Sequence, residues 1–471
     1  MKEIEIGLNE KYPGQFWILK DSLKETPFNA LLYVSGEGKI DIEISYPDFL
    51  VENVELTNFL NSSDELFDVQ GRVMVGHVMY NVSLFCCSTI NINSHFFVKS
   101  RDKSMFHQYL KIRAAAYVLG VLVDSKTRIV RGEFKFSALS HWCDGLQCKE
   151  SGGEICLQAH NQYSTKTKNG DELILHNDYE KKNMGQRVLF EQTGSLEIRF
   201  SQSCVFEEVL DYGRIYNDFF ALITNQKSNI MEEYIYFESD QNKYKLVTED
   251  QMFCATPSEQ VGFSFKSLTN NMSILHDWYD SYKNTNLAYA LFFDSYHNRE
   301  RYKLDVLIDT YARSFEGMIT RHYREKKLFM SRNANKQIID KIKKCLEPCL
   351  DAILTIGMKY SGDMPDYMSK YKQTILSGLA HVYELSLRNR IDYFLDLHSK
   401  YFEHDFKKYD KDKIIKEIIK FRNAYAHADD SKMSNEDIFI LCRFLKKMIL
   451  VHLFSDVLKI DDFKIELADI Y

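Results

Sequence analysis

The sequence predicts an α+β protein: a β-rich N-terminal domain, folded as an antiparallel sandwich or a barrel-like sheet, followed by a C-terminal all-α helical bundle. Up to about residue 265, apolar and polar residues alternate with the period of two that is typical of strands. After about residue 270, apolar residues recur every three or four positions, as on one side of a helix. A chain of 471 residues is also long for a single core. We therefore expect two domains, residues 1–265 and 266–471, with the core of the bundle at about 300–460.

The strand pattern is found in five segments of the N-terminal domain. They are rich in Val, Ile, Tyr and Phe, and Gly, Asn and Asp interrupt them, as expected of strands joined by turns. The segments are 28–46, 71–90, 115–123, 132–142 and 194–206. The stretch 217–226 differs, because its apolar residues predict a short helix.

The helical pattern is found in five segments of the C-terminal domain. In the first segment, Leu304, Leu307, Ile308, Tyr311 and Phe315 recur at spacings of three and four, which predicts a long amphipathic helix. The segments are 301–325, 335–360, 371–402, 412–427 and 435–460. Several amphipathic helices in succession are typical of a helical bundle.

Composition and charge argue against a disordered chain, an overall basic nucleic-acid-binding protein and a membrane protein. A hydrophobic content of 45% and a charged content of 27% indicate an ordinary globular chain. The formal net charge of -7 gives no overall basic surface, so any contact with a polyanion must be local. The N-terminus shows no signal-peptide pattern and no apolar run approaches the roughly 18 residues that span a bilayer, so we expect a cytoplasmic protein without membrane contact. The ten cysteines are then expected to be reduced thiols.

The segment "FRNAYAHADD", residues 421–430, carries the strongest candidate for a catalytic site. Ile415 and Ile418 belong to an apolar stripe, and Arg422, seven residues after Ile415, lies on the same side of the helix. His427 follows Arg422 by five residues, which is about 140° around an ideal helix. The two side chains can therefore meet only if the helix ends near them or if a second chain completes the site.

A helix end is expected directly after this motif. Ser434, with Asp437 three residues later, forms a capping box that would start the next helix. His427 would then stand at a helix terminus beside a connecting loop, where it could turn toward Arg422.

An arginine and a histidine together supply the groups that cleave a phosphodiester without a metal ion. Arginine binds phosphate through two N–H groups and stabilises the charge of a phosphorane-like state, while histidine transfers protons near neutral pH. In RNA, the nucleophile comes with the substrate as its 2′-OH. The lysines before the motif, Lys420 among them, could bind backbone phosphates, although a solvated helix face explains such a run equally well. The non-catalytic interpretation is a histidine that ends a helix and an arginine whose aliphatic stem covers the core.

The stretch "RNAYAH" within a helical bundle resembles the signature of HEPN ribonucleases, an arginine, a polar residue, three further residues and a histidine. The wider chain resembles the ApeA-like phage-defence proteins, which join a β-rich N-terminal domain to such a bundle. The N-terminal likeness lies in "GQFW" at 14–17, in a Gly-containing hairpin at 67–87 and in the stretch 114–142, which ends in Trp142. The resemblance covers nearly the whole chain, and the HEPN motif is its specific part.

This resemblance implies a metal-independent endoribonuclease that acts in anti-phage defence by abortive infection, with the β-rich domain as sensor or regulator. Arg422 and His427 would be the catalytic pair, and Asn423 would orient the phosphate or the histidine. RNA, with transfer RNA as one candidate, would be cleaved to a 2′,3′-cyclic phosphate and a 5′-OH without a cofactor. The resemblance also implies a homodimer or higher homo-oligomer in which two motifs face one cleft, and a phage-derived trigger. The alternative is a catalytically inactive HEPN module that binds RNA or nucleotides, or that only assembles an oligomer.

Two further residues are candidates for the same site. Glu316 lies beside the apolar stripe of the first helix, where its carboxylate could orient the catalytic pair or could instead pair with Arg313 or Thr320. Tyr425 could stack on a base of single-stranded RNA or could pack within the bundle or a dimer.

Candidate metal ligands occur in the segment 141–160. They are His141, Cys143, Cys148, Cys156 and His160. The segment lacks the paired Cys-x2-Cys spacing of zinc ribbons and fingers, so free thiols are the simpler interpretation, and zinc stays open. The adjacent acids Asp429 and Asp430 are more typical of a turn than of a metal site. We predict no metal in the catalytic site.

Overall fold

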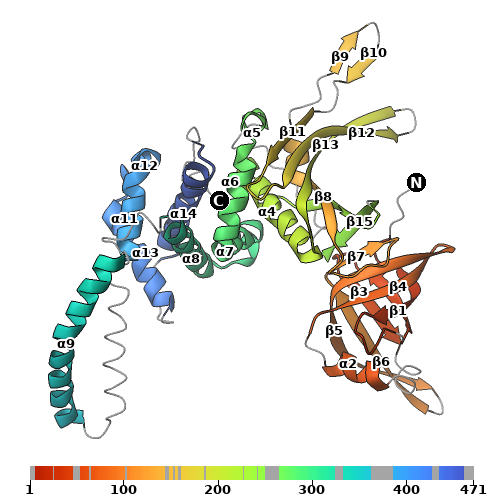
Figure 1. The fold of residues 1–471 in the computed structure, drawn as a ribbon, viewed down its shortest axis with the longest axis horizontal. Helices are drawn as coiled ribbons and strands as arrows, with labels where there is room; N and C mark the ends of the chain where they lie inside the picture. Colours follow the sequence, from red (N-terminus) through yellow and green to blue (C-terminus); the bar gives the residue numbers. More distant parts are fainter. Residues whose placement is uncertain are drawn as a thin grey trace. The chain divides into compact units, whose positions relative to one another are not determined.

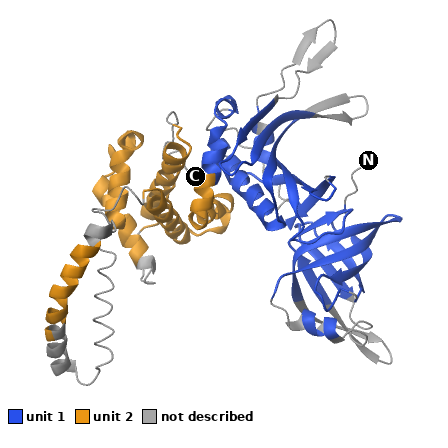
Figure 2. Ribbon diagram, viewed as in Figure 1, with its two compact units in different colours: residues 1–279 blue, residues 280–471 orange. Residues whose placement is uncertain are grey.

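The computed structural model contains two compact units, residues 1–279 and 280–471, which Figure 2 shows in different colours. The residues that the structure describes are 6–24, 26–45, 54–62, 65–100, 103–143, 148–151, 154–157, 161–184, 187–225, 227–240, 242–249, 265–323, 332–361, 386–426 and 434–460. None of the helices formed by these residues is both long and apolar enough to cross a membrane.

Six antiparallel strands close into a barrel in the first part of the N-terminal unit (Figure 1). They are β1 (Lys11–Ile18), β2 (Phe28–Val34), β3 (Ile40–Ser45), β4 (Phe67–Val75), β5 (Val78–Ser100) and β6 (Lys103–Ala114). Their order is β5-β4-β1-β2-β3-β6, and the pairing of β5 with β6 closes the circle. Alternate residues of each strand face the interior, so that Phe16, Ile18, Leu32 and Val34 are fully buried. The barrel-like N-terminal sheet expected from the alternating pattern is confirmed.

The turn between β4 and β5 requires a glycine. Val75 pairs with Val78, so the loop has two residues, and Gly76 has a φ of +63°. A two-residue hairpin loop with positive φ twists in the same sense as its strands, and glycine adopts it without strain. Gly71 in β4 has a different role, because a Cβ there would lie 2.4 Å from the Phe16 ring. The barrel core therefore depends on glycine where the strand passes over that ring.

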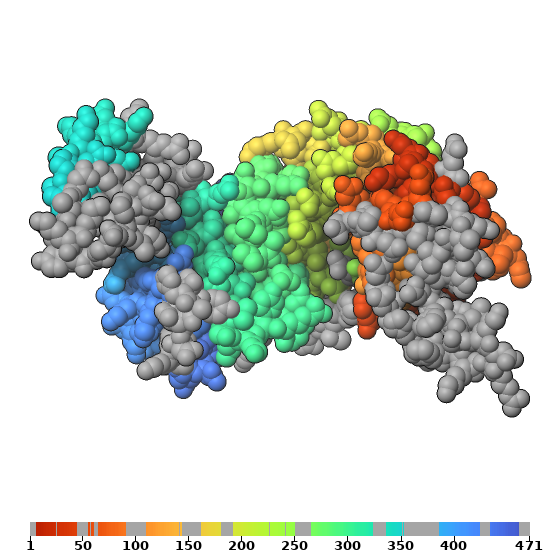
Figure 3. All heavy atoms as spheres, turned by 90° about the horizontal axis from the view of Figure 1, so that it is seen from below, coloured from red at the N-terminus to blue at the C-terminus, as the bar shows by residue number. Residues whose placement is uncertain are grey.

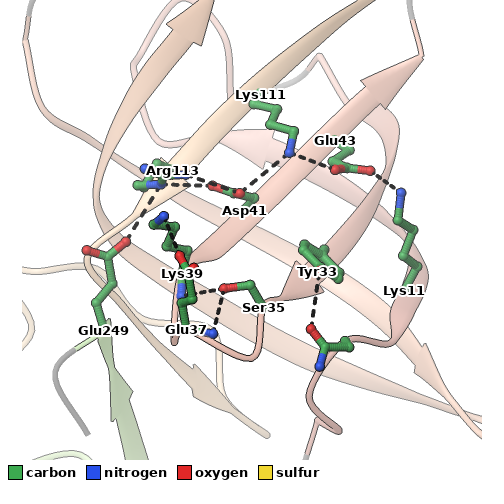
Figure 4. A network of polar contacts seen from close by, with 11 residues as sticks. Lys11, Tyr33, Ser35, Glu37, Lys39, Asp41, Glu43, Lys111, Arg113 and Glu249 are labelled. Atoms are coloured by element: carbon green, nitrogen blue, oxygen red, sulfur yellow. Dashed lines mark hydrogen bonds and ion pairs between the residues drawn. The ribbon is translucent and has the colours of Figure 1, made fainter. Parts of the chain in front are cut away.

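An ion-pair network joins β1, β3 and β6 on the barrel (Figure 4). The Glu43 carboxylate forms ion pairs with Lys11 at 2.5 Å and with Lys111 at 2.9 Å. Asp41, whose side chain is 4% exposed, pairs with Arg113 at 3.0 Å. Since each carboxylate in this network already faces a cation, we interpret it as a clamp between strands and not as a ligand site.

A second antiparallel sheet continues from the barrel through the pairing of β5 with β7. Its strands are β7 (Ala116–Leu119), β8 (Ile129–Phe136), β11 (Asn161–Lys166), β12 (Glu172–Met184), β13 (Arg187–Cys204), β14 (Ile230–Phe237) and β15 (Lys243–Thr248), and β9 (Cys148–Ser151) pairs separately with β10 (Glu154–Leu157). Their order is β11-β12-β13-β8-β14-β15-β7. Helix α4 (Phe206–Thr224) packs against this sheet, and in the barrel α2 (Val54–Ser62) contacts β5.

Two expectations for this region are wrong in detail. The segment 132–142 is a strand only to Phe136 and continues as helix α3 (Ser137–Trp142), because Ala138, Leu139 and Trp142 are buried at helical spacing. The short helix expected at 217–226 is the second half of α4, which begins at Phe206. The backbone N–H of Val205, which precedes α4, donates to the Glu208 carboxylate at 2.9 Å and so caps the start of the helix. Charged residues in this first turn interrupt the apolar pattern of the sequence.

Helix α6 (Ser273–Asn284) packs on α4, while Phe265 of helix α5 (Phe265–Asn270) contacts the rings of Trp142 and Tyr163. The Trp278 indole donates to the carbonyl of Ile215 at 2.8 Å, and the rings of Tyr279 and Tyr212 stack with centroids 4.7 Å apart. These contacts explain why the first compact unit extends to Tyr279. A division of the chain into folding units at residue 265 stays a prediction.

The C-terminal unit is helical, as expected. Its elements are α7 (Asn286–His297), the 3-10 turn η2 (Arg299–Arg301), α8 (Leu304–His322), α9 (Arg332–Ser361), α11 (Leu387–Leu397), α12 (Ser399–Phe406), α13 (Lys411–Ala426), α14 (Asn435–Val451) and the π-helical turn η4 (His452–Val457). The expected N-cap of α14 is confirmed, since the Ser434 hydroxyl accepts the Asp437 N–H at 3.1 Å. Residues 362–385 lie outside the described residues, and with them the first part of the expected helix 371–402, residues 371–385. In the space-filling view, the green surface of α7 and α8 adjoins the blue surface of the later helices (Figure 3).

Candidate active site

Three helices of the C-terminal unit bring one carboxylate between two guanidinium groups. Arg422 on α13 donates from Nη2 to Oε2 of Glu316 on α8 at 3.4 Å. Arg390 on α11 lies with Nη1 3.7 Å from the other oxygen of Glu316 and donates to the Thr320 hydroxyl at 2.5 Å. The side chains are 39% exposed for Arg422, 29% for Glu316 and 12% for Arg390. The cluster therefore lies at the edge of the core and is open to solvent on the side of Arg422.

The helical pattern of the sequence positions Arg422. Ile415, Ile418 and Phe421 of α13 are almost completely buried and anchor that side of the helix in the bundle. Arg422 follows Phe421 directly and lies at the border of this apolar surface, as the sequence predicts. Its guanidinium reaches Glu316 on α8.

The structure shows which side chains Glu316 contacts. Arg313 pairs with Asp309 at 2.8 Å instead of with Glu316, and Thr320 is occupied by Arg390. Glu316 instead contacts Arg422, as one of the two interpretations expected. Its role in any reaction stays a prediction.

Sequence reasoning missed Arg390. The signal that singled out Arg422 was present, because Arg390 stands four residues before Phe394 and eight before His398, both of which are buried in the bundle. An arginine on the apolar side of α11 needs a carboxylate or another acceptor nearby. Glu316 and the Thr320 hydroxyl satisfy that need.

The electrostatics of the cluster favour an anion. Two guanidinium groups share one carboxylate, which leaves a formal charge of +1 on the three side chains. An arginine has five N–H donors, and a single pair with Glu316 leaves several of them on Arg422 to bind phosphate oxygens. Glu316 can thereby fix the plane of the guanidinium without occupying it completely.

The other expected site residues differ in how the structure places them. The Asn423 side chain accepts from Arg422 Nη1 at 3.4 Å and is exposed. The Lys420 side chain is 66% exposed and pairs with Glu417 at 3.7 Å, so it does not contact the Arg422 cluster in this structure. The described part of α13 ends at Ala426, so His427, Asp429 and Asp430 lie outside the described residues, as does the side chain of Tyr425.

Of the five zinc candidates, only Cys143 has a side chain that the structure describes, so the zinc site stays a prediction. Cys143 is buried, and its backbone ends helix α3. The side chains of His141, Cys148 and Cys156 and all of His160 lie outside what the structure describes. Within the described part of the chain, no three His, Cys, Asp or Glu side chains are placed to hold a metal ion.

A second polar cluster is buried at the C-terminal ends of α8 and α11. The Asp456 carboxylate accepts from Tyr323 and contacts His452 Nδ1 at 2.8 Å and His398 Nε2 at 3.2 Å. The π-helical turn His452–Val457 brings Asp456 back toward His452. Burial alone would raise the pKa of Asp456, but the hydrogen bonds from His398 and His452 outweigh it and hold that pKa well below its ordinary value.

This buried cluster is distinct from the cluster at Arg422. Tyr323, the residue directly after α8, follows Glu316 by seven positions, which places it about 10 Å farther along the helix axis on the same side. Burial also raises the pKa of Tyr323, and the hydrogen bond to Asp456 adds to the effect, so the hydroxyl stays protonated. We interpret these groups as a satisfied polar network that joins α8, α11 and the end of the bundle.

Comparison with known proteins divides the chain in the same way. Residues 11–284, more than half of the chain, match the family model described as ApeA N-terminal domain 1. Residues 287–458 match the model described as Apea-like HEPN; this range runs from the second residue of α7 through η4 and contains all residues of the Arg422 cluster. Neither curated proteins nor solved structures gave a match.

Proposed function

The chain belongs to the ApeA family of anti-phage HEPN nucleases, and from this premise we propose that it is a metal-independent endoribonuclease of abortive infection. Its substrate is RNA, with transfer RNA as one candidate. The reaction is attack of a 2′-OH on the adjacent phosphorus. The β-rich unit senses a phage-derived trigger and restrains the helical unit until then, because an unrestrained ribonuclease would poison its own cell.

The proposed chemistry assigns one task to each side chain. Arg422 binds the scissile phosphate through its free N–H donors and stabilises the charge that builds on the phosphorane-like oxygens. His427 handles the proton that leaves the 2′-OH or the proton that the departing 5′-oxygen needs. The 2′-oxygen bonds to phosphorus while the bond from phosphorus to the 5′-oxygen breaks. The products are a 2′,3′-cyclic phosphate and a 5′-OH, and Asn423 orients the phosphate or the histidine.

The observation that supports this proposal is the contact between Glu316 and Arg422. A carboxylate 3.4 Å from Nη2 holds one edge of the guanidinium, which stays partly exposed. Arg390 adds a second positive charge beside the same carboxylate. The two arginines together give a net positive site in a protein whose formal charge is -7, as local binding of a polyanion requires.

The spacing of Arg422 and His427 supports a homodimer. Five residues separate them, and α13 is helical through Ala426. Residues five apart on a helix point about 140° apart, so a regular helix would not direct both side chains at one phosphate. A composite cleft, in which one protomer supplies the arginine and its partner the histidine, removes this difficulty.

Sequencing the RNA 5′-OH ends in cells tests the proposal. Cells that express the wild type should accumulate 5′-OH ends at defined positions in one class of RNA, and cells that express His427→Ala should not. The positions would identify the substrate at the same time. Equal 5′-OH ends in both strains, with both proteins present at the same level, would reject the ribonuclease.

One observation favours the alternative, a HEPN module without catalysis. Both arginines of the cluster already have protein partners, which is also what a purely structural ion-pair group would show. Under this alternative, Arg422→Ala would weaken RNA binding or oligomerisation, and the toxicity of the protein would be unchanged.

A further inference from the structure

A shallow pocket that is open to solvent lies between η2, α8 and α14 of the helical unit. Three of its lining residues are cations, Arg299, Arg443 and Lys446, and none of its lining residues is an acid. Apolar and aromatic side chains, such as Leu307 and Tyr311 of α8, form the remaining wall. Such a concentration of positive charge in a partly apolar pocket is costly unless an anion balances it.

Arg443 gives the clearest sign of a missing acceptor. Its Nε and Nη2 atoms are buried and have no hydrogen-bond partner among the described residues. The guanidinium carbon lies 5.5 Å from the centre of the Phe439 ring, a contact that uses the π face and leaves these N–H groups unsatisfied. A buried, unsatisfied donor costs about 1–3 kcal/mol, and more when it is charged. A ligand that accepts hydrogen bonds would remove this cost.

Lys446 and Arg299 add to the positive charge. The Lys446 ammonium lies 5.0 Å from the centre of the Tyr296 ring. Burial and then the charge of Arg299 lower the pKa of Lys446 to about 8. Arg299 donates from Nη1 to the carbonyl of Tyr302 at 3.3 Å, which fixes its guanidinium beside the pocket. The pocket therefore holds cations that repel one another.

The pocket is separate from the Arg422 cluster. Leu307, in its wall, and Glu316 are nine residues apart on α8, which places them about 13 Å apart along the axis and on opposite sides of the helix. A ligand here would not occupy the place of the scissile phosphate, so the pocket goes beyond the proposed function.

We propose that this pocket binds the terminal phosphate of a small phosphomonoester or free phosphate. Such a phosphate carries about -1.5 to -2 charge at neutral pH, which matches three cations better than the single charge of a phosphodiester. Its oxygens accept from the guanidinium groups of Arg443 and Arg299, which bind phosphate in a fork. Because the pocket is shallow and open to solvent, the phosphate would lie at its mouth and the organic part of the ligand would lie outside it.

Titration calorimetry on the full-length protein tests the site with inorganic phosphate as the ligand. The wild type should bind saturably, and sodium chloride at equal ionic strength should give no such isotherm. Arg443→Met and Arg299→Met should each weaken binding about tenfold or more, because each removes a charge-assisted hydrogen bond.

Arg214→Met is the matched control. Arg214 is an exposed cation of the β-rich unit that pairs with Asp211, so this variant loses the same charge and should bind as the wild type does. Heat produced equally by chloride, or equal affinity in Arg443→Met and the wild type, would overturn the site. Arg299→Met gives the same decision if Arg443→Met does not fold.

The pH dependence of the affinity gives a second readout. The other ionisable residues that line the pocket are Arg299, Arg443, Tyr311 and Cys442, and the Tyr296 ring lies under the Lys446 ammonium. Burial raises the pKa of Cys442 to about 12 and raises that of both tyrosines, so of these groups only Lys446 should titrate between pH 7 and 9. The second pKa of a phosphomonoester is about 6, so glycerol 3-phosphate is a dianion in this range, and the affinity of the wild type for it should fall as the pH rises through about 8. Lys446→Arg should bind with a flat profile, and an unchanged slope in this variant would contradict the assignment.

Matched pairs of ligands identify the source of the phosphate. Glycerol 3-phosphate and AMP, each beside its unphosphorylated counterpart, separate recognition of the phosphate from recognition of the organic part. Both phosphomonoesters should bind, while glycerol and adenosine should not. Adenosine that binds as tightly as AMP would overturn the proposal, and binding of inorganic phosphate alone would assign the site to the free anion.

Discussion

Glu316 and Arg422, 106 residues apart in the chain, form an ion pair of 3.4 Å that joins α8 to α13. This contact links the residue that sequence reasoning placed at the centre of the proposed reaction to a carboxylate on a distant helix. Because both side chains are partly exposed, the contribution of the pair to stability is small, at most about 1 kcal/mol. Its consequence is the orientation of the guanidinium.

Removal of the Glu316 charge should reduce RNA cleavage more than stability. In Glu316→Gln, Arg422 loses the partner that orients it, so we expect kcat to fall about tenfold, with a change in KM below about threefold. The melting temperature should shift by only a few degrees. Initial rates on an RNA substrate over a range of concentrations measure both constants.

Glu417→Gln is the control for this variant. Glu417 lies on the same helix as Arg422 and pairs with the exposed Lys420, so the change in charge is the same without a contact to Arg422. Rates of Glu417→Gln should match the wild type. Equal losses in the two variants would mean that Glu316 acts only through the overall charge.

Mixed dimers should reveal a composite cleft. Arg422→Ala and His427→Ala are each expected to be inactive alone. If one protomer supplies the arginine and its partner the histidine, every heterodimer regains one intact site, and random mixing should restore about a quarter of the wild-type rate. A mixture that stays inactive, although subunit exchange is demonstrated, would place both groups of each site in one protomer.

Glu233 should make the β-rich unit less stable as the pH rises. Neither carboxylate oxygen has a hydrogen-bond partner among the described residues, and burial raises the pKa of Glu233 to about 8. The folded protein thus keeps the proton while the unfolded chain loses it at its ordinary pKa near 4.3, so stability is lost between these two values. Glu233→Met should gain an advantage over the wild type that grows from pH 5 to 8, up to about 4 kcal/mol. Denaturant unfolding at several pH values measures it, and a constant difference would refute the linkage.

Asp456 should make the helical unit more stable at neutral pH than in acid, the opposite of the effect of Glu233 on the β-rich unit. Its pKa is held well below the ordinary value because His398 and His452 donate to the carboxylate, so it stabilises the folded state above pH 4 and this stabilisation is lost in acid. Asp456→Asn should destabilise the helical unit at neutral pH by about 3 kcal/mol, because the histidines and Tyr323 lose their shared acceptor. The deficit should shrink as the pH falls below 4. A deficit that is independent of pH would show that only the shape of the side chain counts.

Particular residues show how far sequence patterns extend. The alternation of Phe28–Val34 and the helical spacing of Ile415, Ile418 and Phe421 reflect local geometry, and the barrel and α13 follow from them. The sequence pattern predicts a strand over Ser137–Trp142, where the chain is helical, because a short apolar run fits the period of a strand as well as that of a helix. Local patterns thus predicted which elements form better than where they end.

In the candidate site, local patterns predict the positions of single residues but not which residues contact one another. The place of Arg422 at the border of the apolar stripe is a local property, and so is that of Glu316. The choice of Arg390 as their neighbour depends on how α11 packs on α8, which no local spacing states. The cluster around Asp456 depends on a π-helical turn, and local spacing does not predict the changed hydrogen-bond register of such a turn.

Cleavage of RNA by the purified protein in EDTA tests the central claim most directly. The wild type should cut RNA in excess EDTA and leave a 2′,3′-cyclic phosphate and a 5′-OH, and a 2′-deoxy substitution at the cleaved nucleotide should prevent the cut. Arg422→Ala and His427→Ala, folded as the wild type, should leave the RNA intact. Cleavage that needs a divalent ion, or that survives loss of Arg422, His427 or the 2′-OH, would contradict the account.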